Sequence, residues 1–139
     1  MVQLIVGKKG KGKTKQLLDK VNASIQVAEG NICYLDKSTK NMFELNNKVR
    51  LINVSDYLVS NASEFLGFIC GIVSQDHDLQ EMYLDSFLKN SCLEGEDITE
   101  AILKLEKISE KFDVNFVLSV SMDESELPEA VKKNILISL

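Results

Sequence analysis

The sequence predicts one α/β domain of three layers, in which a mostly parallel sheet of about five strands carries helices on both faces. Two observations predict this fold class. Short apolar segments typical of buried strands alternate with longer segments in which apolar residues recur every three or four positions. In addition, no internal repeat and no linker rich in Pro, Gly or Ser divides the chain. Residues 1–139 therefore form a single domain, large enough to bury a core.

Strands are expected at five short apolar runs: 2–6, 31–36, 49–54, 79–85 and 114–121. The run at 49–54 alternates only partly, which is typical of a short strand or of one near a sheet edge. The segment 134–139 is either a closing strand or an apolar tail.

Helices are expected where the apolar spacing follows a 3.6-residue period. They cover 14–29, the segment from the cap at 61–64 through Val73, the segment from the cap at 97–100 through Phe112, and a short stretch from Pro128 to Lys133. The second of these is apolar nearly all round, which predicts that it is among the most buried parts of the protein.

The composition is that of an ordinary globular protein, with 45% hydrophobic and 27% charged residues. The longest strongly apolar run, 65–73, is too short to cross a bilayer, and the chain starts directly in a strand rather than in a signal peptide. Cys33, Cys70 and Cys92 lack metal-site spacing and are interpreted as buried free thiols. We therefore expect a cytoplasmic protein with no membrane partner.

One stretch carries the chemistry, and it follows the pattern G-x-x-x-x-G-K-[ST] between the first strand and the first helix. We call it the glycine–lysine loop; it consists of Gly7, Lys8, Lys9, Gly10, Lys11, Gly12, Lys13 and Thr14. The glycines let successive backbone N–H groups point at a phosphate, and the helix adds its free N–H groups and its dipole. Lys13 is expected over the β- and γ-phosphate oxygens, and the Thr14 hydroxyl on Mg²⁺. The alternative is a lysine-rich turn that only caps a helix.

On this loop and its flanks, over residues 1 to 30, the sequence resembles the P-loop NTPase superfamily. Along most of its length it is also similar to a family of small bacterial ATP-binding proteins, sometimes named ATPase or twitching-motility protein. The resemblance implies a RecA-like or thymidine-kinase-like branch, ATP and Mg²⁺ as ligands, and Lys13 in catalysis. The guanine-reading motif [NT]-K-x-D is absent, because Val49-Arg50 follows Asn47-Lys48. An adenine nucleotide is therefore expected by elimination.

A nucleotide site also needs a carboxylate near the metal, and ligands bind at the carboxyl ends of parallel strands. Four polar strand ends qualify: Asp36, Asn53, Asp85 and the pair Ser119/Ser121. We assign the Walker-B role, holding Mg²⁺ through its water shell, to Asp85 rather than Asp36. The reason is fold analogy, since the strand directly after the loop helix usually lies farther out in the resembled branches. Either carboxylate could instead cap the following turn.

Two departures from the resembled pattern bear on catalysis. Ser86 follows Asp85, where many ATP-hydrolysing members carry Glu. Only one of the sixteen basic residues, Arg50, is an arginine. An arginine finger must therefore be Arg50 or come from another subunit, unless a lysine such as Lys132 or Lys133 serves less well. Slow hydrolysis is expected rather than fast.

The favoured function is a Mg-dependent ATP-binding P-loop protein, a slow ATPase with a regulatory or assembly role, acting with a protein partner or as a homo-oligomer. The second hypothesis is a non-catalytic nucleotide- or phosphate-binding interaction module. A nucleoside or small-molecule kinase comes third, because a lid rich in arginine cannot be built from one arginine. A net charge of −5 argues against broad nucleic-acid binding.

Overall fold

The computed structural model describes all of residues 1–139 and contains one six-stranded sheet in the order β3-β2-β4-β5-β1-β6. Every pair of neighbouring strands is parallel. The strands are β1 (Val2–Val6), β2 (Asn31–Asp36), β3 (Arg50–Asn53), β4 (Leu79–Leu84), β5 (Asn115–Val120) and β6 (Ile135–Ser138). The predicted α/β class is confirmed, and the expected count of about five strands is one too low. The partly alternating run at 49–54 forms the short edge strand β3, as its pattern indicated.

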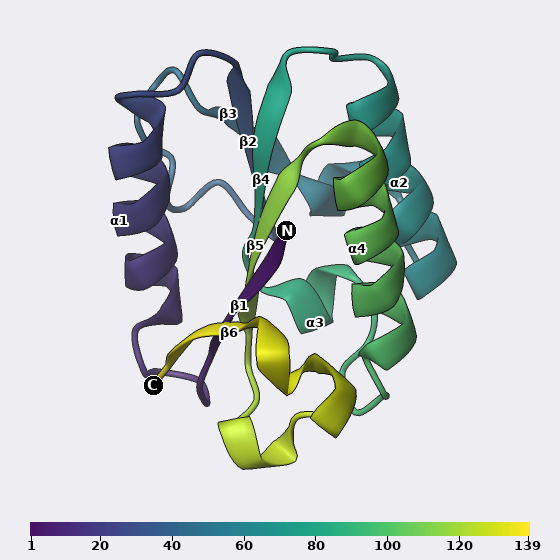
Figure 1. The fold of residues 1–139 in the computed structure, drawn as a ribbon. Helices are drawn as coiled ribbons and strands as arrows, with labels where there is room; N and C mark the ends of the chain where they lie inside the picture. Colours follow the sequence, from purple (N-terminus) through teal and green to yellow (C-terminus); the bar gives the residue numbers. More distant parts are fainter.

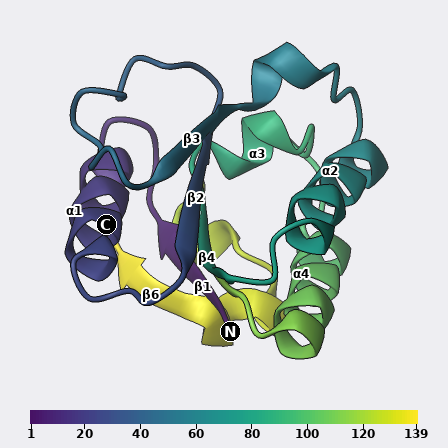
Figure 2. The same ribbon diagram turned by 90° about the horizontal axis from the view of Figure 1, so that it is seen from above.

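Helices cover both faces of the sheet, which gives the three layers visible in Figures 1 and 2. On one face lies α1 (Lys13–Ile25); on the other lie α2 (Ala62–Ser74), the single-turn α3 (Phe87–Asn90) and α4 (Thr99–Phe112). Short 3₁₀ segments follow β3 and β5, at Val54–Tyr57, Glu124–Glu126 and Glu129–Asn134.

The sixth strand, β6, comes from the segment 134–139, which the sequence predicted to be either a closing strand or an apolar tail. β6 pairs in parallel with β1, and the backbone N–H of Leu139 donates to the carbonyl of Val6 at 2.9 Å. The side chain of Asn134 also donates to the carbonyl of Val2 at 2.9 Å. These contacts hold the end of β6 against the point where β1 enters the glycine–lysine loop.

Two hydrophobic clusters lie on opposite sides of the sheet because strand side chains alternate between its faces. In β1, Leu4 and Val6 belong to the larger cluster, which includes residues of α2 and α4, while Ile5 belongs to the smaller cluster beneath α1. In β5, Leu118 and Val117 divide in the same way. The central strands β1 and β5 are therefore buried on both faces, as is typical of a parallel sheet, whereas the edge strand β6 has no fully buried residue.

This alternation also decides which polar strand ends lie together. Tyr34 of β2 is in register with Tyr83 of β4, and Tyr83 is in register with Val117 of β5. All three face α1. Two residues farther along each strand, the same face is reached by Asp36, Asp85 and Ser119. The sheet thus directs these three side chains toward the glycine–lysine loop.

The prediction that the helix after residue 61 is among the most buried parts is wrong. In α2 only Phe65, Ile69 and Val73 are buried, whereas Leu66 and Phe68 pack partly against the core and partly face solvent. A helix that covers one face of a sheet buries a single stripe. No further layer covers α2 from outside, so its remaining apolar side chains stay partly exposed (Figure 2).

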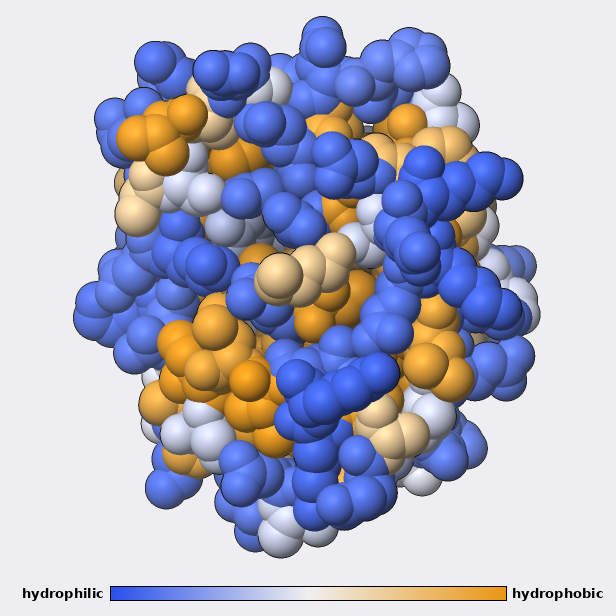
Figure 3. All heavy atoms as spheres, in the orientation of Figure 1, coloured by the Kyte–Doolittle hydropathy of each residue, from blue (hydrophilic) through white to orange (hydrophobic).

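Hydrophilic residues cover most of the face in Figure 3, as the composition of an ordinary globular protein indicated. Hydrophobic residues gather over β6, where Leu136 is 40% exposed. No helix has both the length and the apolar character that a membrane span requires.

Of the three cysteines, which are all free thiols, Cys33 is buried, but Cys70 and Cys92 are exposed, contrary to the prediction.

Candidate functional site

The glycine–lysine loop leaves its backbone donors without partners in the protein. Gly12, at φ 94° and ψ 22°, caps the amino end of α1 in a left-handed conformation that glycine adopts without strain. No side chain caps this helix end, and no backbone N–H of residues 7–14 donates to a backbone carbonyl. Gly7, Lys13 and Thr14 are buried or half-buried, and N–H groups in such positions normally find an acceptor. The amides of this loop are therefore available to an anion.

The start of the loop lies against the end of β6. A Cβ on Gly7 would lie 3.1 Å from the Leu139 Cβ atom and 3.2 Å from its carbonyl oxygen. A side chain at this position would push the two segments apart. The glycine at the first position of the pattern therefore serves a close approach as well as a turn.

The side chain of Lys13 folds back over the loop and is only 7% exposed. Its ammonium donates to the carbonyl of Lys8 at 3.0 Å, the one acceptor that it contacts. Burial lowers the pKa of the Lys13 ammonium, and the negative charge of Asp85 partly opposes this shift. An ammonium carries three donors, so two remain for a ligand.

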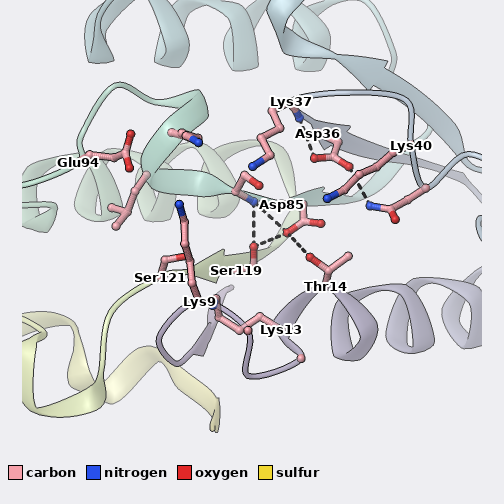
Figure 4. Close-up of a pocket in the computed structure, with 16 residues that line it drawn as sticks. Lys9, Lys13, Thr14, Asp36, Lys37, Lys40, Asp85, Glu94, Ser119 and Ser121 are labelled. Carbon is pink, nitrogen blue, oxygen red and sulfur yellow. Dashed lines mark hydrogen bonds between the residues drawn. The ribbon is translucent and has the colours of Figure 1, made fainter.

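Asp85 is the centre of the hydrogen-bond network and is 2% exposed. Its Oδ1 accepts from the hydroxyls of Thr14 at 3.3 Å and of Ser119, and from the backbone N–H of Ser86 at 2.9 Å. Its Oδ2 accepts from the hydroxyl of Tyr34 at 2.8 Å. Figure 4 shows the Thr14 and Ser119 hydroxyls directed at this carboxylate. Four donors from β2, β5, α1 and the turn after β4 thus fix its position.

Tyr34 is the member of this network that the sequence did not reveal. Burial raises the pKa of the Tyr34 phenol well above its ordinary value, and the negative charge of Asp85 raises it further. The phenol therefore stays protonated and donates to the carboxylate. A tyrosine within an apolar strand needs a partner for its hydroxyl. That requirement hinted at a role, but the partner depends on the pairing of β2 with β4.

Asp36 lies in the same pocket at the end of the neighbouring strand β2, with 1% of its surface exposed. It accepts from the backbone N–H of Lys37 at 2.7 Å and from the amide of Asn41 at 3.2 Å. Burial raises the pKa of the Asp36 carboxyl; the Lys37 N–H opposes this shift, and the charge of Asp85 adds to it. Asp85, and not Asp36, is the carboxylate that contacts Thr14.

These groups line a pocket of about 530 Å³, here called the central pocket (Figure 4). Sixteen residues line it, and one of them, Leu88, is hydrophobic. Five are lysines: Lys9, Lys13, Lys37, Lys40 and Lys89. The sequence pattern identified the first two. The other three come from the loop after β2 and from α3, so only the fold brings them to the loop.

Other residues that the sequence put forward lie outside the central pocket. Gly7, Lys8 and Lys11 belong to the loop but do not line the pocket.

Arg50 lies at the amino end of β3, away from the carboxyl ends that form the site. Lys132 pairs with Glu129 at 3.1 Å, and Lys133 lines a separate hollow beside Met1. None of the three cations named in the sequence analysis therefore reaches the site from within this chain.

The structure contains no group of three or more His, Cys, Asp or Glu side chains that could hold a metal ion. Mg²⁺ in phosphate sites is usually bound by one or two protein oxygens together with waters and the phosphates themselves. The hydroxyl of Thr14 and the carboxylate of Asp85, 3.3 Å apart, form a pair of this kind. The side chains present therefore fit a Mg·phosphate ligand.

No protein-family model matches the chain, and no curated protein is similar enough in sequence to count as a match.

We expect replacement of Tyr34 by Phe to lower the free energy of unfolding by about 1.5–3 kcal/mol, the usual size for a hydrogen bond to a charged group. The measurement is urea denaturation at pH 7. Tyr57→Phe serves as the control, because Tyr57 is exposed and its hydroxyl makes no hydrogen bond. A Tyr34→Phe protein as stable as the control would contradict the described role of Asp85 as an acceptor.

Stability should depend on pH through Asp36. Its folded pKa lies above the unfolded value of about 3.9, so the folded state binds the proton more tightly. As pH rises from that unfolded value through the raised folded value, wild type should lose stability relative to Asp36→Asn. Chemical denaturation of both proteins at several pH values from 4 to 7 measures the difference. A wild-type protein that instead gains stability relative to Asp36→Asn as the pH rises would show that the pKa is lowered.

Proposed function

We propose that the protein is a P-loop ATPase that binds Mg·ATP in the glycine–lysine loop and hydrolyses it slowly. The observation that carries this proposal is the set of unpartnered backbone N–H groups over residues 7–14. Within the same loop the buried ammonium of Lys13 donates to the Lys8 carbonyl, and the Thr14 hydroxyl contacts Asp85. Free amides, one ammonium and one hydroxyl at a helix amino end form the set of donors that a polyphosphate requires.

The sheet order supports the RecA-like or thymidine-kinase-like branch that the resemblance implies. β1, which leads into the loop, and β4, which leads into Asp85, are separated by one strand, β5. β2, which leads into Asp36, lies one strand farther out. The choice of Asp85 over Asp36 was based on this outer position of the strand that follows the loop helix.

Within this proposal each side chain has a distinct task. Lys13 neutralises oxygens of the phosphate chain, and Thr14 and Asp85 are the groups that would hold Mg²⁺. When bound, the metal supplies charge neutralisation and orientation of the phosphates. Asp36 accepts a proton from the attacking water, and its raised pKa makes it a better base than an ordinary aspartate. Asp36 thereby serves as the base in place of the glutamate that many ATP-hydrolysing members of the resembled branches carry at the position of Ser86.

The regulatory or assembly role follows from the expected slow rate. No arginine lines the central pocket, and lysine lacks the bidentate geometry of a guanidinium. An arginine from a protein partner or from a second copy of the chain would raise the rate. Such dependence on a partner suits a cytoplasmic regulator more than a metabolic enzyme. A kinase remains disfavoured for the same lack of arginine.

One observation favours the second candidate, a binding module without hydrolysis. The carboxylate of Asp85 accepts four hydrogen bonds, which saturate much of its capacity within the protein. A carboxylate held in this way is suited to a structural role. If the wild-type protein releases phosphate in a single turnover and the Asp36→Asn variant does not, the protein is an ATPase and not a binding module.

We expect Lys13→Ala to weaken Mg·ATP binding tenfold or more, a loss of about 1.4 kcal/mol or greater, because it removes the ammonium over the loop. Isothermal titration calorimetry gives the dissociation constant, and circular dichroism shows whether the variant folds.

Lys15→Ala is the matched control. It removes the same charge two residues away, from a side chain that pairs with Asp19 at 2.9 Å and does not line the central pocket. Equal ATP affinity of Lys13→Ala and wild type would rule out the proposed function.

A further inference from the structure

The lining of the central pocket is unusual for a site that selects an organic ligand. Pockets for small molecules are lined mainly by hydrophobic and aromatic side chains, with a few polar groups that fix orientation. Here one of sixteen lining residues is hydrophobic. Most of the other fifteen lining residues carry charged side chains or hydroxyls. Leu88 is therefore the one hydrophobic side chain that could pack against a flat base.

No aromatic side chain lines the pocket, although the chain contains six phenylalanines and three tyrosines. A purine would have no ring on which to stack. The groups that could read the edge of a base are also mostly engaged. The Asn41 amide donates to Asp36, and Ser119 donates to Asp85. Glu94 is the one lining carboxylate without a hydrogen bond, and it is exposed.

The charges, in contrast, are arranged for an extended anion. Four lysine ammonium groups of the lining, those of Lys9, Lys37, Lys40 and Lys89, pair with no carboxylate and form no hydrogen bond. Figure 4 shows Lys37 and Lys40 reaching in from the β2 side and Lys9 rising from the loop opposite. The whole chain has a net charge of −5, whereas in the lining of this pocket five lysines outnumber three carboxylates.

The ammonium groups on the two walls of the pocket outnumber its three carboxylates and repel each other, and a polyanion placed between them relieves that repulsion. The glycine–lysine loop supplies amides to one side of such an anion. Lys37 and Lys40 supply positive charge to the other side, where the loop has no donor. The two walls together match a chain of several phosphates better than a single phosphate group.

We propose that the central pocket recognises the polyphosphate chain and not the base, so that it binds nucleoside triphosphates of any base as well as inorganic tripolyphosphate. Lys37 and Lys40 hold phosphate oxygens on the side away from the glycine–lysine loop. This inference rests on the proposed function, because it assumes that the loop binds phosphate. It replaces the expectation of an adenine nucleotide, which depended on elimination of a guanine motif.

The test is isothermal titration calorimetry with Mg²⁺ and six ligands: ATP, GTP, CTP, UTP, inorganic tripolyphosphate and adenosine. We expect the four nucleotides to bind within about threefold of one another and tripolyphosphate within about tenfold of ATP. Adenosine should show no binding at millimolar concentration. The double variant Lys37→Ala/Lys40→Ala should weaken all five phosphate ligands by a similar factor of about ten or more.

A matched control removes two charges elsewhere. Lys107→Ala/Lys111→Ala alters exposed lysines of α4, outside the central pocket, and should leave every affinity unchanged. Lys13→Ala must weaken tripolyphosphate as much as it weakens ATP. If it does not, the inorganic ligand binds elsewhere and the inference is overturned.

The outcomes separate the inference from the function on which it rests. ATP binding that exceeds binding of the other nucleotides by tenfold or more would overturn base-independent recognition and leave the proposed function intact. ATP binding without tripolyphosphate binding would have the same meaning. Failure of every phosphate ligand to bind would overturn the proposed function, and the inference with it.

Discussion

The buried carboxylate of Asp85 is the interaction on which the arrangement of the site depends. Its four donors come from Tyr34 in β2, Ser119 in β5, Thr14 at the start of α1 and the Ser86 amide in the turn after β4. One acceptor thus fixes the carboxyl ends of three strands relative to the amino end of the loop helix. Because charge-assisted hydrogen bonds in a buried setting are strong, this junction is rigid.

The two aspartates of the site differ in how the protein uses them. Asp85 is saturated by donors, which stabilise a fixed orientation beside Thr14. Asp36 has fewer partners, and burial raises its pKa. A pair of carboxylates in unequal surroundings divides naturally into one group that holds and one that accepts a proton. The lysines on the opposite wall complete the pocket, and in the proposed function their charge attracts the phosphate chain. Leu88 is the one hydrophobic residue of the lining.

Local features of the sequence predicted more of this structure than non-local ones. The eight residues of the glycine–lysine loop form a contiguous pattern, and the strands follow from short apolar runs, so both were predicted. The role of β6, the partner of Tyr34 and the approach of Lys37, Lys40 and Lys89 depend on which strands pair and how loops return. The spacing of apolar residues along the chain does not reveal which strands pair or where the loops return. The burial of α2 was overestimated for a related reason, since apolar residues do not reveal how many layers cover a helix.

The central claim is that the backbone amides of residues 7–14 bind phosphate, and amide NMR tests it most directly. In ¹⁵N–¹H correlation spectra recorded as Mg·ATP is added to the wild-type protein, the largest shifts should come from amides of this loop, with Gly10 and Gly12 among them. Hydrogen bonding of these N–H groups to phosphate oxygens causes such shifts. Spectra in which the loop amides stay unchanged while signals elsewhere move, or in which nothing moves, would contradict the account.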